Sequence, residues 1–95
     1  MNFSDGENTG CLAFSIAGHD KGRLYVVTGQ FYDMILLSDG DLKKVSSPKK
    51  KKLKHIQLIK KERLSSERLN DTDIKRAIKM FLTKCNYGKD GKEAD

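Results

Sequence analysis

Large and small side chains alternate along residues 11–17 with the two-residue period of a β-strand. Leu12, Phe14 and Ile16 fall on one side of this segment, so we expect a strand with one buried face. Residues 18–22 then interrupt the alternation with two glycines and three polar residues, which predicts a tight loop.

Two further apolar runs follow this loop. Residues 24–32 are rich in β-branched and aromatic side chains and predict a second strand, with Gly29 at a bulge or corner. Residues 34–37 predict a short, nearly fully buried third strand. Asp39-Gly40 is a strong signal for a type I′ hairpin turn, which would return the chain as a fourth strand over residues 42–45.

The segment after this hairpin carries many lysines. Ser46-Ser47-Pro48 breaks the pairing, so we expect the lysines that follow to lie in a loop. Residues 53–59 resume the strand pattern and supply a fifth strand. Five short strands within about fifty residues have the spacing of a small β-barrel, so the fold class predicted is mainly β.

The period changes to that of an amphipathic helix after residue 70. Asp71 and Asp73 suit the positive N-terminal end of a helix, and Asn86 with Gly88 can end it. The apolar stripe, which we expect to pack on the barrel or on a second chain, consists of Ile74, Ala77, Ile78, Phe81, Leu82 and Cys85.

These patterns divide the chain into five segments. A single small domain is all that 95 residues allow, with polar ends on either side of its ordered part. The predicted segments are a flexible N-terminal segment (1–9), a barrel (10–60), a connector (61–70), an amphipathic helix (71–86) and a disordered tail (87–95).

Positive charge is concentrated in one part of the chain. The formal net charge is +6, and residues 43–54 contain seven lysines without an acid, namely Lys43, Lys44, Lys49, Lys50, Lys51, Lys52 and Lys54. Such a stretch attracts polyanions over about 8 Å at physiological salt. RNA, DNA, anionic membranes and acidic protein tails are candidates, and a solvated loop that only aids solubility is the alternative.

Several other classes of protein and site are not expected. No apolar run approaches the roughly 20 residues that cross a membrane, and residues 1–10 do not have the pattern of a signal peptide, so we expect a cytoplasmic protein without a membrane partner. Cys11 and Cys85 are expected to be free thiols. Together with His19 and His55 they lack the close spacing of a zinc site, so neither a metal nor a cofactor is expected.

Catalytic motifs are missing from the sequence as well. The chain has no nucleophile elbow, phosphate-binding Walker loop, dinucleotide fingerprint or zinc-protease motif. A domain of this size also has little room for a pocket that excludes water. We therefore expect neither an enzyme nor a small-molecule substrate.

The loop between the first two strands carries the most specific motif. Residues 18–27 resemble a KOW motif, in which two glycines bracket a basic residue before a hydrophobic strand. Residues 10–57 are also similar to short clostridial-type KOW-domain proteins described as RNA-binding or ribosomal-like. The three segments that carry this similarity are Ala17-Gly18-x-Asp20-Lys21-Gly22-Arg23, Asp39-Gly40-x-Leu42 and Pro48-Lys49-Lys50-Lys51-x-Leu53-Lys54-His55.

The resemblance implies an SH3-like β-barrel that binds RNA without catalysis. It implies ribosomal RNA as the target and ribosomal proteins as further candidate partners. Lys21 and Arg23 would contact phosphate together with the lysines of residues 43–54. Gly18 and Gly22 would shape the loop through positive φ angles, so that its amides could face phosphate oxygens. His19 stands where an arginine is common in the family, which weakens a phosphate contact at that position.

Aromatic residues add a second kind of contact and leave an alternative function open. Tyr32, beside a predicted turn, is the best candidate to stack on an unpaired base. Because SH3-like barrels also bind proteins, a docking module of the transcription or translation machinery is the alternative, and DNA binding is a third. Binding that weakens steeply with salt would indicate a nucleic acid, whereas a docking module would bind through a few buried anchors.

Overall fold

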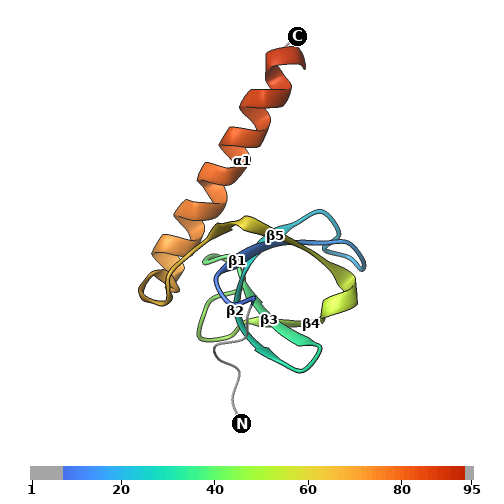
Figure 1. The fold of residues 1–95 in the computed structure, drawn as a ribbon, viewed down its shortest axis with the longest axis vertical. Coiled ribbons are helices and arrows are strands. Elements are labelled where there is room, and N and C mark those ends of the chain that lie inside the picture. Colours follow the sequence, from blue (N-terminus) through green and yellow to red (C-terminus); the bar gives the residue numbers. More distant parts are fainter. Residues whose placement is uncertain (1–7, 94–95) are drawn as a thin grey trace.

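The computed structural model describes residues 8–93 and shows a five-stranded antiparallel sheet followed by one C-terminal helix (Figure 1). The strands are β1 (Cys11–Ser15), β2 (Leu24–Phe31), β3 (Met34–Ser38), β4 (Lys49–Lys52) and β5 (Ile56–Arg63), and the helix is α1 (Asp71–Glu93). Short 3₁₀ turns cover Leu53–His55 and Ser66–Arg68. The prediction of a mainly-β fold with a C-terminal helix is confirmed.

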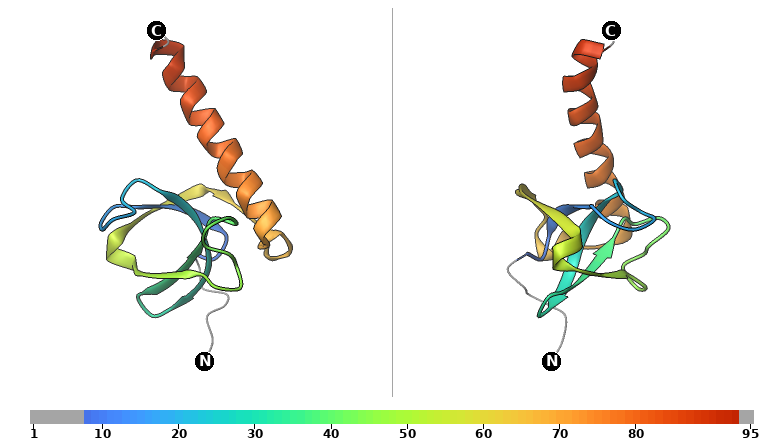
Figure 2. Two further views of the ribbon diagram at one scale, coloured as in Figure 1. Left: turned by 180° about the vertical axis from the view of Figure 1, so that it is seen from behind. Right: turned by 90° about the vertical axis from the view of Figure 1, so that its right-hand side faces the viewer.

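The sheet curls strongly about its inner face, as two further views show (Figure 2). Its strand order is β4-β3-β2-β1-β5, so the two edge strands, β4 and β5, are consecutive in the chain. A register shift between Val27 and Gly29 of β2, and another between Cys11 and Leu12 of β1, place bulges where the strands bend. Among the described residues no register pairs join β4 to β5, so the sheet is not closed.

Apolar side chains form two cores, one on each face of the sheet. The inner core contains Ala13, Tyr25, Val27, Ile35, Leu37 and Ile56. The outer core lies between the sheet and the helix and contains Leu12, Leu24, Val26, Leu64 and Ile74. The expectation that the first strand buries only one face is therefore wrong, because α1 covers the face that would otherwise meet solvent. Ile16, which lies beyond the end of β1, is exposed.

The first half of α1 holds the helix on the sheet. Asn70 Oδ1 accepts a hydrogen bond from the Asp73 N–H at 2.9 Å and caps the first turn. Ile74 is fully buried, and Phe81 packs edge-to-face on Phe14 with ring centroids 6.2 Å apart. The stripe predicted from the sequence thus faces the sheet along its first turns, with Ile78 partly buried beside Phe81. Leu82 is largely exposed, and the side chain of Cys85 lies outside the described part.

The helix is longer than its sequence pattern indicates. It continues to Glu93, so the segment predicted as a disordered tail is helical where the structure describes it. Gly88 does not end it, since a glycine within a helix is unfavourable by only about 1 kcal/mol. The second half of α1 extends well away from the sheet (Figure 1).

The fourth strand lies elsewhere than the sequence predicts. Residues 42–45 form no strand, because the carboxylate of Asp39 accepts hydrogen bonds from the N–H groups of Asp41 and Lys43, at 2.9 and 2.8 Å. Asp39-Gly40 therefore opens a loop instead of a tight hairpin. This loop is held to α1 by a hydrogen bond from the Val45 N–H to Asp71 Oδ1 at 2.8 Å. The partner of β3 is instead the lysine run, as β4.

The last part of the sheet also differs in detail. Residues 53–55 form a 3₁₀ turn between the edge strands, so β5 begins only at Ile56. β5 then continues to Arg63, three residues into the predicted connector. Within the described residues, no helix is long and apolar enough to span a membrane.

Candidate functional site

The lysine run forms an edge strand whose side chains alternate between two environments. Lys49 and Lys51 of β4 pair in register with Leu37 and Ile35 of β3, whose side chains belong to the inner core. Both lysines are partly buried, whereas Lys50 and Lys52, which point to the other side of the strand, are exposed. The expectation of a lysine-rich loop is therefore wrong. Lysines also suit an edge strand, because their charge discourages pairing with another chain.

The inner lysines converge on a single carboxylate, that of Asp20. Lys51 Nζ lies 3.0 Å from Asp20 Oδ1, and Lys49 Nζ lies 3.7 Å from Oδ2. The hydroxyls of Ser15 and Tyr25 each donate a hydrogen bond to the same carboxylate at 2.8 Å. The Lys51 and Asp20 side chains are each only 12% exposed. We call these five residues the Asp20 cluster.

The electrostatics of the Asp20 cluster favour the ionised carboxylate. Burial alone would raise the pKa of Asp20, but the hydrogen bonds from Lys51, Tyr25 and Ser15 and the charge of Lys49 hold it well below its ordinary value. Burial, together with the hydrogen bond to Asp20, raises the pKa of Tyr25 to about 12. Two of the lysines predicted to contact phosphate thus share one carboxylate within the protein, which balances one of their two positive charges.

The glycine-bracketed loop is closed by its own backbone. Gly18 and Gly22 have φ angles of 89° and 93°, as expected for Gly22 from the sequence. The N–H groups of Lys21, Gly22 and Arg23 donate to carbonyl oxygens of Gly18, Ser15 and Asp20. These three amides are therefore bonded within the loop, and the two glycines close the turn.

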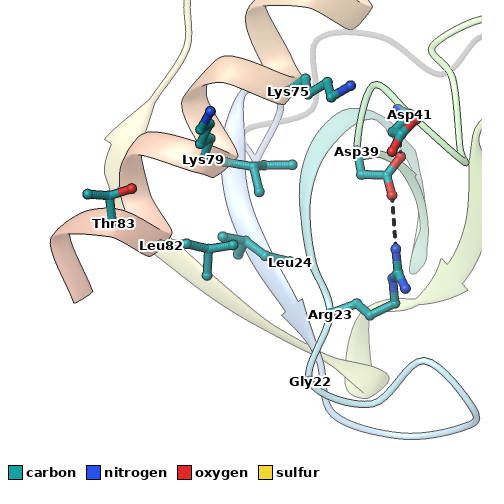
Figure 3. A pocket seen from close by; sticks show the side chains of 10 residues that line it. Gly22, Arg23, Leu24, Asp39, Asp41, Lys75, Lys79, Leu82 and Thr83 are labelled. Atoms are coloured by element: carbon teal, nitrogen blue, oxygen red, sulfur yellow. Dashed lines mark hydrogen bonds and ion pairs between the residues drawn. The ribbon is translucent and has the colours of Figure 1, made fainter. Parts of the chain in front are cut away.

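The two cations of this loop differ in their availability. Arg23 lies 3.5 Å from the Asp39 carboxylate, with its side chain about half exposed at 51% (Figure 3). Lys21 is exposed. Among the described residues, Lys21 has no carboxylate within ion-pairing distance. Of the pair predicted to contact phosphate, Arg23 is shared with an acid, whereas Lys21 is not paired with one within residues 8–93.

Five further predicted lysines, besides Lys21, combine exposure with free charge. Within residues 8–93 none of them has a carboxylate within 4.0 Å of its ammonium group. Three lie along the outer side of β4 and the 3₁₀ turn after it, and two lie in the loop beside α1. They are Lys50, Lys52 and Lys54, which we call the outer row, and Lys43 and Lys44.

Tyr32 lies at the tip of the β2–β3 hairpin, close to the end of the outer row. Its side chain is 83% exposed, and its φ angle of 56° is in the left-handed region that a bulky residue rarely adopts. The Leu53 N–H donates to the Asp33 carbonyl at 2.7 Å, which fixes this hairpin tip to the residue after Lys52. An exposed tyrosine, whose ring contacts that of Phe31 at a centroid distance of 4.6 Å, therefore lies on a hairpin tip that is bonded to the end of β4.

Two groups of residues lie outside the predicted site. Asp20, the acceptor of the inner lysines, is the one acid of a loop that also contains Lys21 and Arg23. Lys75, Arg76 and Lys79 lie outside the apolar stripe of α1. The signal that they matter is tertiary, since a loop brings Lys44 to them.

Potential metal ligands do not cluster in the described part of the chain. It contains no group of three or more His, Cys, Asp or Glu side chains placed to hold a metal ion. Cys11 is a buried free thiol.

No protein-family model matches the chain, and no curated protein is significantly similar to it. The candidate site therefore depends on the geometry described above.

Proposed function

We propose that this protein is a non-catalytic RNA-binding protein of the KOW type, with an SH3-like barrel that holds the phosphate backbone against the outer row. The observation that carries the proposal is the alternation along β4. Lys49 and Lys51 are both held by Asp20, whereas Lys50, Lys52 and Lys54 are exposed and, within residues 8–93, have no carboxylate partner. Several adjacent free cations favour a polyanion as ligand, because each phosphate that they neutralise releases counterions.

The architecture supports the SH3-like assignment. Five short antiparallel strands curl about one small core, and bulges in β1 and β2 sharpen the bend. A 3₁₀ turn joins the two edge strands. The KOW-like motif occupies the loop between β1 and β2, where Asp20 fastens it to β4.

Tyr32 supports a nucleic acid with unpaired bases as the ligand. The two-residue turn between Phe31 and Met34 places Tyr32 at a positive φ angle, which is unfavourable by about 1–3 kcal/mol for a residue other than glycine. At this hairpin tip it presents an aromatic ring to solvent beside Lys52. Aromatic rings stack on exposed bases of single-stranded loops, which structured RNA provides.

The resemblance to KOW proteins suggests ribosomal RNA as the target, a cytoplasmic location and ribosomal proteins as neighbours. Lys21, Lys43 and Lys44 would add contacts to those of the outer row. Phosphate contacts of this kind position a protein on its ligand without reading bases, so sequence preference should be weak.

The proposal is tested by titrating the protein against an rRNA fragment at several salt concentrations. If four to six lysines engage phosphates, log K against log salt should have a slope of about −3 to −5. Lys50→Gln/Lys52→Gln/Lys54→Gln should flatten the slope by about two units. Tight binding to a protein partner with salt-tolerant affinity, and no RNA binding, would indicate a docking module. Equal affinity for duplex DNA of the same sequence would indicate a general nucleic-acid binder.

A further inference from the structure

An open hollow lies between the loop after β3 and the first turns of α1. It has a volume of about 560 Å³. The loop contributes Gly40 and Lys44, and the helix contributes Asp71, Thr72, Lys75, Arg76 and Lys79. The lining therefore has four cationic side chains and one carboxylate, an excess of three positive charges.

The cations of this hollow are available to a ligand. Lys44, Lys75, Arg76 and Lys79 are all exposed, and none has a carboxylate within ion-pairing distance among the described residues. The single acid, Asp71, already accepts a hydrogen bond from the Val45 N–H at 2.8 Å.

The neighbouring hollow, which Lys75 and Lys79 also border, does contain acids (Figure 3). There Asp39 is paired with Arg23 at 3.5 Å. Asp41 is the other acid of that hollow, and no ion pair joins it to either lysine in the described chain. Neither lysine is therefore bound to an acid of that hollow in the described chain.

The loop is held firmly against the helix, which fixes Lys44 beside the helical cations. A Cβ atom built on Gly40 would overlap the carbonyl oxygen of Asp71, so loop and helix backbones touch. The hydrogen bond between Val45 and Asp71 ties the same loop a second time. Lys44 thus keeps its place beside the helix in the folded protein.

The arrangement is unfavourable for an isolated protein. Lys75 and Lys79 are four residues apart, and Arg76 and Lys79 are three apart, so like charges adjoin on one side of the helix. A bound anion would remove this repulsion.

We infer that Lys44, Lys75, Arg76 and Lys79 form a second phosphate-binding surface that contacts the backbone of the RNA bound by the outer row. This inference depends on the proposed RNA binding and extends it to a region outside the KOW-like part. Arg76 can bind a phosphate group bidentately, and the lysines act as point charges.

The test uses the full chain and a variant, Lys75→Gln/Arg76→Gln/Lys79→Gln, in which glutamine preserves helix propensity. The control, Lys60→Gln/Lys61→Gln/Arg68→Gln, removes the same charge from β5 and the turn after it. Each protein is titrated against one structured rRNA fragment over a range of salt, after circular dichroism and urea unfolding have shown that it is folded. Parallel titrations use vesicles that contain an anionic phospholipid.

The helix variant should flatten the salt slope by about two to three units, and the control by less than one. A parent protein that binds the RNA and a helix variant with the parent's slope would overturn the inference and leave the proposed function intact. A parent protein without salt-dependent RNA binding would overturn both. Loss of vesicle binding in the helix variant, with its RNA slope unchanged, would assign the surface to membranes and also overturn the inference.

Discussion

The two sides of β4 have the same amino acid and opposite roles. Lys49 and Lys51 lie over the inner core and are bound by Asp20, whereas Lys50 and Lys52 meet solvent with free charge. Four consecutive lysines are therefore not one basic patch. The inner pair fastens the β1–β2 loop to an edge strand, and the outer pair is left for a ligand. The distinction depends on register, because successive side chains of a strand point to opposite sides.

The inner and outer sides of β4 should differ most in their effect on the free energy of unfolding, and Asp20→Asn tests the inner side. It removes the acceptor of two lysines and weakens two hydroxyl hydrogen bonds, which leaves the nearly buried ammonium of Lys51 without a counter-charge. We expect a loss of about 2–4 kcal/mol in the free energy of unfolding, measured in urea. Lys50→Gln/Lys52→Gln should change it by less than about 0.5 kcal/mol. Equal effects of the two variants would show that the sides do not differ.

Low pH should reduce the stability that the Asp20 cluster, on the inner side of β4, contributes to the folded protein. The pKa of Asp20 is lowered in the folded protein, so its contribution to stability is present above the unfolded-state value of about 4 and is lost as the pH falls below it. Between pH 5 and pH 2 the parent should lose about 1–2 kcal/mol more than Asp20→Asn does, after allowance for solvent screening. Parallel pH profiles of the two proteins, from urea unfolding at each pH, would contradict this account.

Tyr32→Asn should separate stability from binding on the outer side. Asparagine tolerates the left-handed region better than tyrosine, so the free energy of unfolding should stay equal or rise by up to about 1 kcal/mol. Affinity for an RNA with an unpaired loop should fall roughly fivefold to tenfold, or about 1 kcal/mol, because one stacking contact is lost. Affinity for a fully paired RNA should not change. A variant that loses affinity for both equally would exclude base stacking.

The sequence predicts the regular parts of this fold better than the segment between β3 and β5. The alternation in β1, the β-branched and aromatic run of β2 and the apolar stripe of α1 are local patterns, and the structure has these elements in place. The predicted strand over residues 42–45 is absent, because the side chain of Asp39 accepts hydrogen bonds from backbone N–H groups that a hairpin would have used. Lysine has a low preference for strands, so only pairing with β3 explains why Lys49–Lys52 is extended.

The same limit applies to the candidate site. Composition locates the lysines along the chain, and the glycine pattern locates the loop with positive φ at Gly22. Which lysines are held in ion pairs is decided by Asp20, which precedes Lys51 by 31 residues. Long-range pairing of this kind has no local pattern, and neither does the approach of Lys44 to α1.

The most direct test of the account removes two charges from either side of the same strand. Lys50→Gln/Lys52→Gln and Lys49→Gln/Lys51→Gln lose equal charge within four residues, and each is titrated against the rRNA fragment over a range of salt while folded. The outer variant should flatten the slope of log K against log salt by about 1.4 to 1.8 units, and the inner variant by less than about half a unit. An inner variant that flattens the slope as much as the outer one would contradict the account.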